Sequence, residues 1–215
     1  MLAALAAFSF TASAATFDDV QFWVGSGANQ AALVIDWKDG KTSESLLWGY
    51  RWNGSATGLD MFEAVVNADS RLFAHVSTPG TYGVSIYGIG YDLNNSGGFA
   101  VSPSLSFDSG GLVVDNSAND ARVATDSADH YVEGWSTGFW DYYTKASSSD
   151  AWAESWVGAS DRVLANGAWD GYSFAPGFSG SAPIDPTPAM VPEPATASFL
   201  TLGALALVCL RRRNA

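Results

Sequence analysis

The chain has 215 residues, 22 acidic against 10 basic side chains and a formal net charge of −12, which excludes nucleic acid and disfavours anionic lipid as partners. Its one cysteine, Cys209, lies near the C-terminus, so residues 15–190 contain no disulfide. A body of this length is sufficient for one domain with its own hydrophobic core.

The first residues have the pattern of a secretion signal. An apolar run over 2–10 precedes Ala12-Ser13-Ala14, which fits the small-x-small rule for a signal-peptidase site. We expect residues 1–15 to be a signal peptide and the mature chain to begin near Thr16. No basic residue occurs before Lys38, so the true start is expected further upstream; the alternative interpretation is an apolar first strand.

Strand patterns dominate residues 16–178, separated by clusters of Gly, Asn, Asp and Ser. Asp39-Gly40 predicts a hairpin between the second and third strands. In the third strand, two sets of residues should lie on opposite faces: Leu46, Trp48, Tyr50 and Trp52 on one, and Leu47, Gly49 and Arg51 on the other. The expected strands are 20–24, 32–37, 45–52, 83–91, 112–115, 130–135 and 138–144.

Two segments favour helix. From 58 to 69, four apolar side chains recur near a period of 3.6, and Thr57 can cap the first turn. From 149 to 157, Trp152 and Trp156 lie four residues apart and predict a second, shorter helix. The expected fold is mostly β: a β-sandwich or jelly-roll-like single domain with one or two short inserted helices.

The sequence contains no compact catalytic motif. His75 and His130 lack the HExxH, His-x-His or Cys/His spacing that suits zinc, and isolated histidines of this kind are usually structural. Residues 83–88 are one residue too long for a nucleophile elbow. Carboxylate pairs for glycoside hydrolysis cannot be recognised from spacing along the chain. We therefore expect a non-catalytic protein, with a hydrolase acting on extracellular polysaccharide as the alternative.

Two acidic loops favour calcium, which prefers oxygen ligands. Asp92, Asn94 and Ser96, followed by Gly97, match the first half of an EF-hand-type loop, whereas Pro103 stands where a bidentate Glu belongs. This pattern predicts a calcium site and a calcium-stabilised adhesive scaffold as a further alternative; a glycine-rich hairpin explains the loop equally well. The second acidic cluster contains Asp115, Asn116, Asn119, Asp120, Asp126 and Asp129.

All nine tryptophans lie in the body, before residue 53 or after residue 134. Exposed Trp and Tyr side chains can stack on sugars or on large planar ligands. The alternative is that alternating aromatics fill the core between two sheets. Trp140, Tyr142, Tyr143 and Trp169 stand among Gly, Asp and Ser residues, and are therefore the candidates for a ligand-binding platform.

Several aromatic and glycine positions in this region carry a resemblance to known proteins. They are Gly138-Phe139-Trp140-Asp141-Tyr142-Tyr143, Trp152, Gly158-Ala159, Asn166-Gly167 and Asp170-Gly171-Tyr172-Ser173-Phe174. Together they resemble a module of exported bacterial proteins associated with cobalamin uptake, although Tyr172 stands where Trp is common. The resemblance implies a planar, tetrapyrrole-like ligand as a candidate beside glycans.

The C-terminal region has three parts. Residues 179–190 hold three prolines and predict a Pro-rich linker between body and membrane. Residues 195–210 are uncharged and cover about 24 Å as a helix, which predicts a short transmembrane helix. Arg211, Arg212 and Arg213 follow and should remain in the cytoplasm, which places the body outside the inner membrane.

Pro192, Glu193 and Pro194 precede this apolar run, and the whole of 191–213 resembles the PEP-CTERM sorting signal of Gram-negative bacteria. The resemblance implies an inner-membrane-anchored precursor. It also implies recognition by an exosortase, a membrane protease-transpeptidase that removes the helix, and delivery to the cell surface or biofilm matrix. Extracellular polysaccharide is the second partner implied.

Excluding both ends makes the remaining body more acidic, because residues 15–190 hold seven basic and twenty-one acidic side chains, a net charge of −14. The function expected from the sequence is therefore an exported surface or matrix protein that acts as a non-catalytic binding or structural module.

Overall fold

The computed structural model of the protein describes residues 14–191. Most of the expected signal peptide, the Pro192-Glu193-Pro194 motif, the apolar run 195–210 and Arg211 to Arg213 lie outside the described residues. Within 14–191, no helix has both the length and the apolar character needed to cross a membrane.

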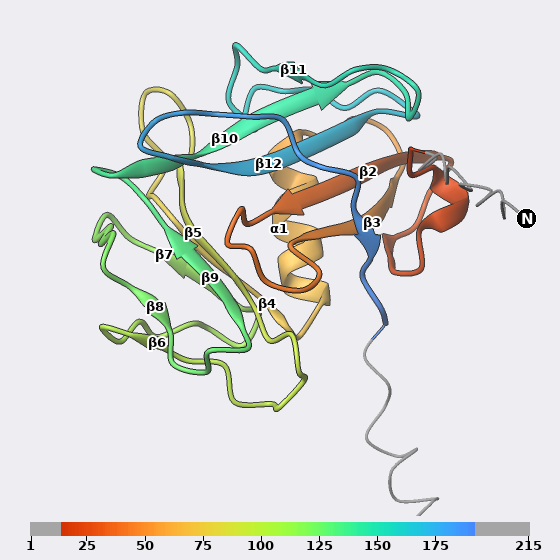
Figure 1. The fold of residues 1–215 in the computed structure, drawn as a ribbon. Helices are drawn as coiled ribbons and strands as arrows, with labels where there is room; N and C mark the ends of the chain where they lie inside the picture. Colours follow the sequence, from red (N-terminus) through yellow and green to blue (C-terminus); the bar gives the residue numbers. More distant parts are fainter. Residues whose placement is uncertain (1–13, 192–215) are drawn as a thin grey trace, which may run out of the picture.

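The described chain is mostly β, as predicted, and its strands form three sheets (Figure 1). The larger sheet has the order β1 (Trp23–Gly25), β3 (Ser45–Trp52), β2 (Asn29–Asp36), β12 (Trp169–Pro176), β10 (Gly138–Lys145) and β11 (Ala153–Glu154), with β13 (Thr187–Pro188) also paired to β3. The smaller sheet has the order β7 (Leu112–Val114), β4 (Leu72–Val76), β5 (Ile86–Tyr91) and β9 (His130–Glu133). A short pair joins β6 (Val101–Ser102) and β8 (Val123–Ala124).

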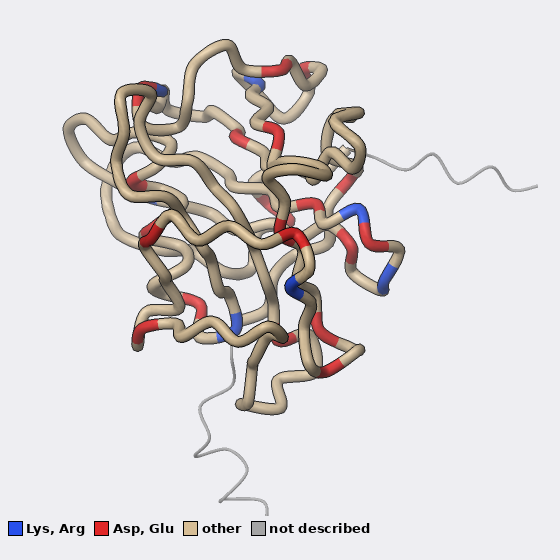
Figure 2. The backbone as a smooth tube through the Cα atoms, turned by 90° about the vertical axis from the view of Figure 1, so that its left-hand side faces the viewer, with Lys and Arg blue, Asp and Glu red and all other residues tan. Residues whose placement is uncertain are grey.

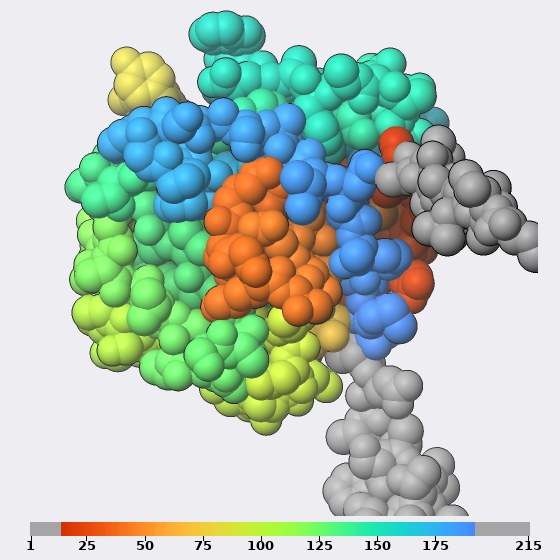
Figure 3. Space-filling view, viewed as in Figure 1, coloured from red at the N-terminus to blue at the C-terminus, as the bar shows by residue number. Residues whose placement is uncertain are grey.

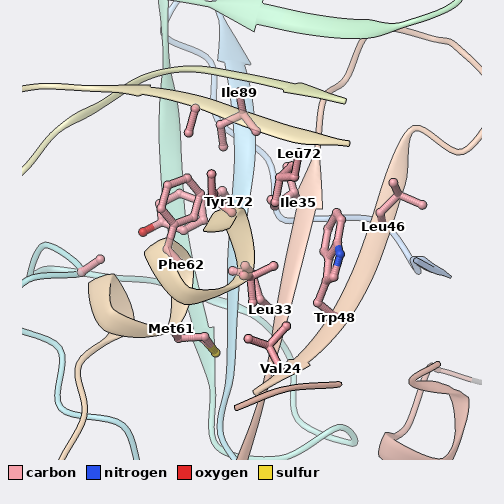
Figure 4. Packing of buried hydrophobic residues seen from close by; sticks show 14 of the residues in the cluster. Val24, Leu33, Ile35, Leu46, Trp48, Met61, Phe62, Leu72, Ile89 and Tyr172 are labelled. Carbon is pink, nitrogen blue, oxygen red and sulfur yellow. The ribbon is translucent and has the colours of Figure 1, made fainter. Parts of the chain in front are cut away.

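One hydrophobic core lies between the inner face of the larger sheet and a second layer, made of the one α-helix of residues 14–191 and the smaller sheet. Figure 4 shows Leu33 and Trp48 of the larger sheet packed with Phe62 of the helix and with Leu72 and Ile89 of the smaller sheet. The alternation predicted for β3 is confirmed, because Trp48 faces this core whereas the adjacent Leu47 packs in a separate cluster on the outer face.

Helix α1 (Gly58–Ala68) confirms the longer of the two predicted helices and its cap. The hydroxyl of Thr57 accepts the backbone N–H of Asp60 at 3.1 Å, and the Asp60 carboxylate accepts the backbone N–H of Thr57 at 2.7 Å. This capping box satisfies two amide donors that the first helical turn leaves free. The apolar side of the helix, including Met61 and Val65, is buried in the core.

The second predicted helix, over 149–157, is wrong. Its N-terminal part forms a turn in which the Ser147 hydroxyl donates to the Asp150 carboxylate at 2.8 Å, and its middle forms β11 beside β10. Ser and Asp favour such turns because their side chains compete with helical backbone hydrogen bonds. Trp152 packs on the outer face of the larger sheet, whereas Trp156 is 95% exposed, so the two rings share no face.

The C-terminal segment 179–190, expected to be a free linker, packs on the domain instead. β13 pairs with β3, and the backbone N–H of Ala189 donates to the Leu47 carbonyl at 2.9 Å. The buried carboxylate of Asp36 accepts the backbone N–H of Ile184 at 2.9 Å. These contacts make 184–190 part of the folded domain, because β3 offers an edge whose backbone groups would otherwise lack partners.

Candidate functional site

An aromatic pocket of about 200 Å³ opens between the inner face of β10 and β12 and the end of the smaller sheet. We call this the aromatic pocket. Its lining contains no Asp, Glu, Lys or Arg side chain. The residues that line it are Val84, Ser85, Ile86, Gly134, Trp135, Phe139, Trp140, Tyr142, Gly158, Ala159 and Tyr172.

The expected exposed platform of Trp140, Tyr142, Tyr143 and Trp169 is wrong, because all four side chains are buried. Trp140 and Tyr142 belong to the inner core, whereas Trp169 lies on the outer face of the same sheet, against Phe17. Strand alternation separates them, so they cannot form one surface. Only Trp140 and Tyr142 contribute to the aromatic pocket.

Trp135 forms the exposed wall of the aromatic pocket, with 59% of its surface accessible. Its ring packs edge-on against Tyr87, with 5.3 Å between ring centroids. The Asp120 carboxylate accepts the backbone N–H groups of Trp135, at 2.5 Å, and of Ser136, at 2.8 Å. Trp135 is therefore held at its backbone by Asp120 and at its ring by Tyr87.

Two loops form the opposite wall of the aromatic pocket. The Ser160 hydroxyl accepts the backbone N–H of Val84 at 3.1 Å, which joins the loop before β5 to the loop after β11. Both loops carry an exposed aromatic side chain, Tyr82 at 91% and Trp156 at 95%. In Figure 3 the corresponding segments, yellow near residue 82 and teal near residue 156, project from the same end of the molecule. We call Tyr82, Trp135 and Trp156 the aromatic rim.

A stacked pair of tyrosines, Tyr142 and Tyr172, lies at the inner end of the pocket, with ring centroids 5.0 Å apart. The Tyr142 hydroxyl donates to the Asp170 carboxylate at 2.5 Å, and Arg162 donates to the same carboxylate at 3.4 Å. Burial raises the pKa of Asp170 above its usual range. The buried hydroxyl of Tyr172 has no hydrogen-bond partner among the described residues.

A second polar cluster, separate from the aromatic pocket, surrounds the buried His75. Its Nδ1 lies 3.2 Å from Glu133 Oε1 and its Nε2 lies 2.8 Å from Asp115 Oδ1. Glu133 also accepts hydrogen bonds from Arg122 at 2.8 Å and from the Tyr131 hydroxyl at 2.5 Å. We call these five residues the His75 network. Every carboxylate in it has hydrogen-bonded partners, which is the condition under which buried charge is tolerated.

The β-sheet register brings this network together. His75 on β4 and Glu133 on β9 are both paired with Gly88, which lies on β5 between them. A Cβ atom at Gly88 would lie 2.6 Å from the Tyr131 hydroxyl oxygen. Glycine therefore fits this position, because a larger residue would displace the Tyr131 hydroxyl that donates to Glu133.

The network lowers the pKa of both carboxylic acids. Hydrogen bonds from Ser117 and His75 lower the pKa of Asp115 to about 2. Burial alone would raise the pKa of Glu133, but hydrogen bonds from His75, Tyr131 and the Asn119 amide hold it below its ordinary value.

Acid should therefore destabilise the protein through this network. A carboxylate whose pKa is depressed by folding contributes stability above its unfolded pKa, and this contribution is lost as the pH falls through the folded pKa. We expect the free energy of unfolding to decline between about pH 4.5 and pH 2. Urea titrations across this range should give a shallower decline for Glu133→Gln than for the wild type; parallel curves would contradict this assignment.

The other histidine, His130, is also buried and paired. Its Nδ1 lies 2.8 Å from Asp39 Oδ2, and its ring stacks on Trp37 with 4.7 Å between centroids. Burial opposes ionisation of Asp39, but the bond with His130 leaves the pKa of this acid lowered. Both histidines thus have structural surroundings, in agreement with the sequence analysis.

The side chains of the expected calcium loop are hydrogen-bonded to the backbone of that loop. Both carboxylate oxygens of Asp92 accept backbone N–H groups, from Ser96 and Gly97, at 2.9 Å each. Asn94 Oδ1 accepts the Ser96 N–H as well, so the oxygens point at their own loop. Within residues 14–191, no group of three or more His, Cys, Asp or Glu side chains is arranged to hold a metal ion. The loop therefore has the hydrogen bonds of an Asx-type turn, and the calcium site stays a prediction.

The acidic residues of the second cluster make separate contacts. Asp115 belongs to the His75 network and Asp120 holds the backbone of Trp135. Asp126 accepts a hydrogen bond from Asn94, and Asp129 accepts the backbone N–H of Leu93.

The aromatic rim was missed by the sequence analysis. Tyr82 stands between Thr81 and Gly83, and Trp135 directly precedes Ser136-Thr137-Gly138. A large aromatic residue inside a turn-like cluster is a usable signal for exposure, because turns lie at the surface.

Comparisons with models of protein families, with curated proteins and with solved structures find no match to this chain.

Proposed function

We propose that this chain is an exported protein of the cell surface or extracellular matrix whose body is a non-catalytic binding module. The two terminal patterns support export: an apolar run with a small-x-small site near Thr16, and the PEP-CTERM-like order of parts in 191–213. By that resemblance, an exosortase processes an inner-membrane-anchored precursor. The two-layered core supports a β-sandwich-like description of the body.

The single observation that carries the binding role is the aromatic pocket beside the exposed Trp135. An exposed tryptophan held by its backbone offers a flat apolar face at low entropic cost, because little motion is lost on binding. Glycans and planar ligands both present flat apolar faces, and extracellular polysaccharide is the partner that fits an exported matrix protein.

A hydrolase is disfavoured by the same pocket. Glycoside hydrolysis needs two carboxyl groups that face the scissile bond about 5 to 9.5 Å apart, and the pocket lining offers none. Asp170, a buried acid that contacts the lining residue Tyr142, is already bound by Tyr142 and Arg162.

Removal of the Trp135 ring tests the binding role. We expect native gels containing neutral or acidic polysaccharides to retard the wild-type protein in at least one case, and Trp135→Ala to weaken that affinity about tenfold. Val123→Ala is the matched control, because Val123 is 57% exposed and does not line the pocket. Retardation that Trp135→Ala leaves unchanged, or depolymerisation of the polysaccharide, would overturn the proposal.

A further inference from the structure

We propose that the aromatic pocket takes one uncharged sugar ring, the terminal ring of a neutral glycan. This inference rests on the proposed binding function and names its ligand class. Three properties of the pocket carry it: its volume, the chemistry of its walls and the charge around it.

The volume limits the ligand to one ring. Pockets for drug-sized ligands enclose roughly 300–1,000 Å³, whereas the aromatic pocket encloses about 200 Å³. A single six-membered sugar ring fits a space of this size, and the next ring of a chain must lie outside it. A tetrapyrrole-like ligand is too large to enter, so the cobalamin-related expectation does not extend to this pocket.

The walls match the two kinds of surface that a sugar ring presents. Trp135 and Trp140 supply aromatic surface for the C–H faces of the ring. Ser85, an exposed residue of the same lining, supplies a hydroxyl that can exchange hydrogen bonds with a hydroxyl group of the sugar. A purely apolar ligand would make no such hydrogen bond, which favours a ring that carries its own polar groups.

The charge around the pocket excludes acidic sugars. Basic side chains are few on the domain, whereas acidic ones are spread over many loops (Figure 2). Two carboxylates contact residues of the lining: Asp120 accepts the backbone N–H of Trp135, and Asp170 accepts the hydroxyl of Tyr142. The nearby cation Arg162 already faces Asp170 at 3.4 Å. A carboxylate in the pocket would lose water without gaining a cation, and this is costly.

Matched oligosaccharides that differ only at C6 test the charge requirement. Probes are hexasaccharides of glucose, mannose and galactose and the corresponding uronic acid oligomers, with binding read from tryptophan fluorescence and calorimetry. We expect a neutral member to bind at least about tenfold more tightly than its acidic counterpart in both low and high salt, because screening cannot restore lost hydration. The disaccharide and the hexasaccharide of that sugar should bind with similar affinity, since one ring is held.

Two variants locate the ligand. Trp135→Ala should weaken binding of the neutral probe about tenfold, and Ser85→Ala, which removes only the hydroxyl, should weaken it about three- to tenfold. Val123→Ala should leave affinity unchanged. Trp135-dependent binding that favours the acidic member, grows with chain length or is unaffected by Ser85→Ala overturns the one-ring inference while leaving the binding function intact. No binding to any probe, or binding independent of Trp135, overturns both.

Discussion

Replacing Trp48 with alanine is expected to lower the free energy of unfolding by about 3–5 kcal/mol. The side chain is fully buried in the core, and its Nε1 donates to the buried carboxylate of Asp69 at 3.0 Å. The substitution leaves a cavity between the larger sheet and the opposite layer (Figure 4), and it removes one hydrogen bond from a carboxylate that then depends on Arg71.

Urea unfolding monitored by circular dichroism measures this loss, and Trp156→Ala is its control. Both variants remove an indole ring, but Trp156 is 95% exposed, so its loss should change stability by less than about 0.5 kcal/mol. Similar losses in the two variants would mean that Trp48 is not in the core.

Glu133→Ala is expected to cost about 3–5 kcal/mol, because it breaks a buried ionic network by removing one partner. It leaves Arg122 and His75 without their shared acceptor and the Tyr131 hydroxyl without its carboxylate. The neighbouring amide of Asn119, which donates to Glu133 at 2.6 Å, also loses its acceptor.

Two further variants separate charge from packing at this site. Glu133→Gln keeps the side-chain size and one carbonyl acceptor, so it should lose less stability than Glu133→Ala. Glu154→Ala removes an exposed glutamate of β11 and should have no measurable effect. The network assignment fails if Glu133→Ala is as mild as Glu154→Ala in the same urea experiment.

The elements predicted best from the sequence are those whose pattern is local. β3 matches its predicted range 45–52, because its alternation reflects the two faces of one strand. Helix α1 was found because Thr57 and the 3.6-residue period are both readable in one short window. By contrast, β4 and β12 were missed; β12 contains Asp, Gly and Ser, yet it is buried at the centre of the larger sheet.

The candidate site was harder to predict because it depends on pairing between distant strands. The sequence identified Trp140 and Tyr142 as aromatic residues among Gly, Asp and Ser. Whether their side chains face solvent, the core or a pocket depends on which other elements pack against β10. His75 and Glu133 are 58 residues apart in sequence and meet only through their common neighbour Gly88. No local pattern encodes such a register.

The strand order of the larger sheet separates the C-terminal segment from the aromatic pocket. The N-terminal segment leads into β1 and the C-terminal segment lies along β3, whereas Phe139, Trp140 and Tyr142 of the aromatic pocket lie on β10. Three strand spacings, about 14 Å, separate β3 from β10. A body held through its C-terminal segment would therefore carry the aromatic pocket three strands away from its point of attachment.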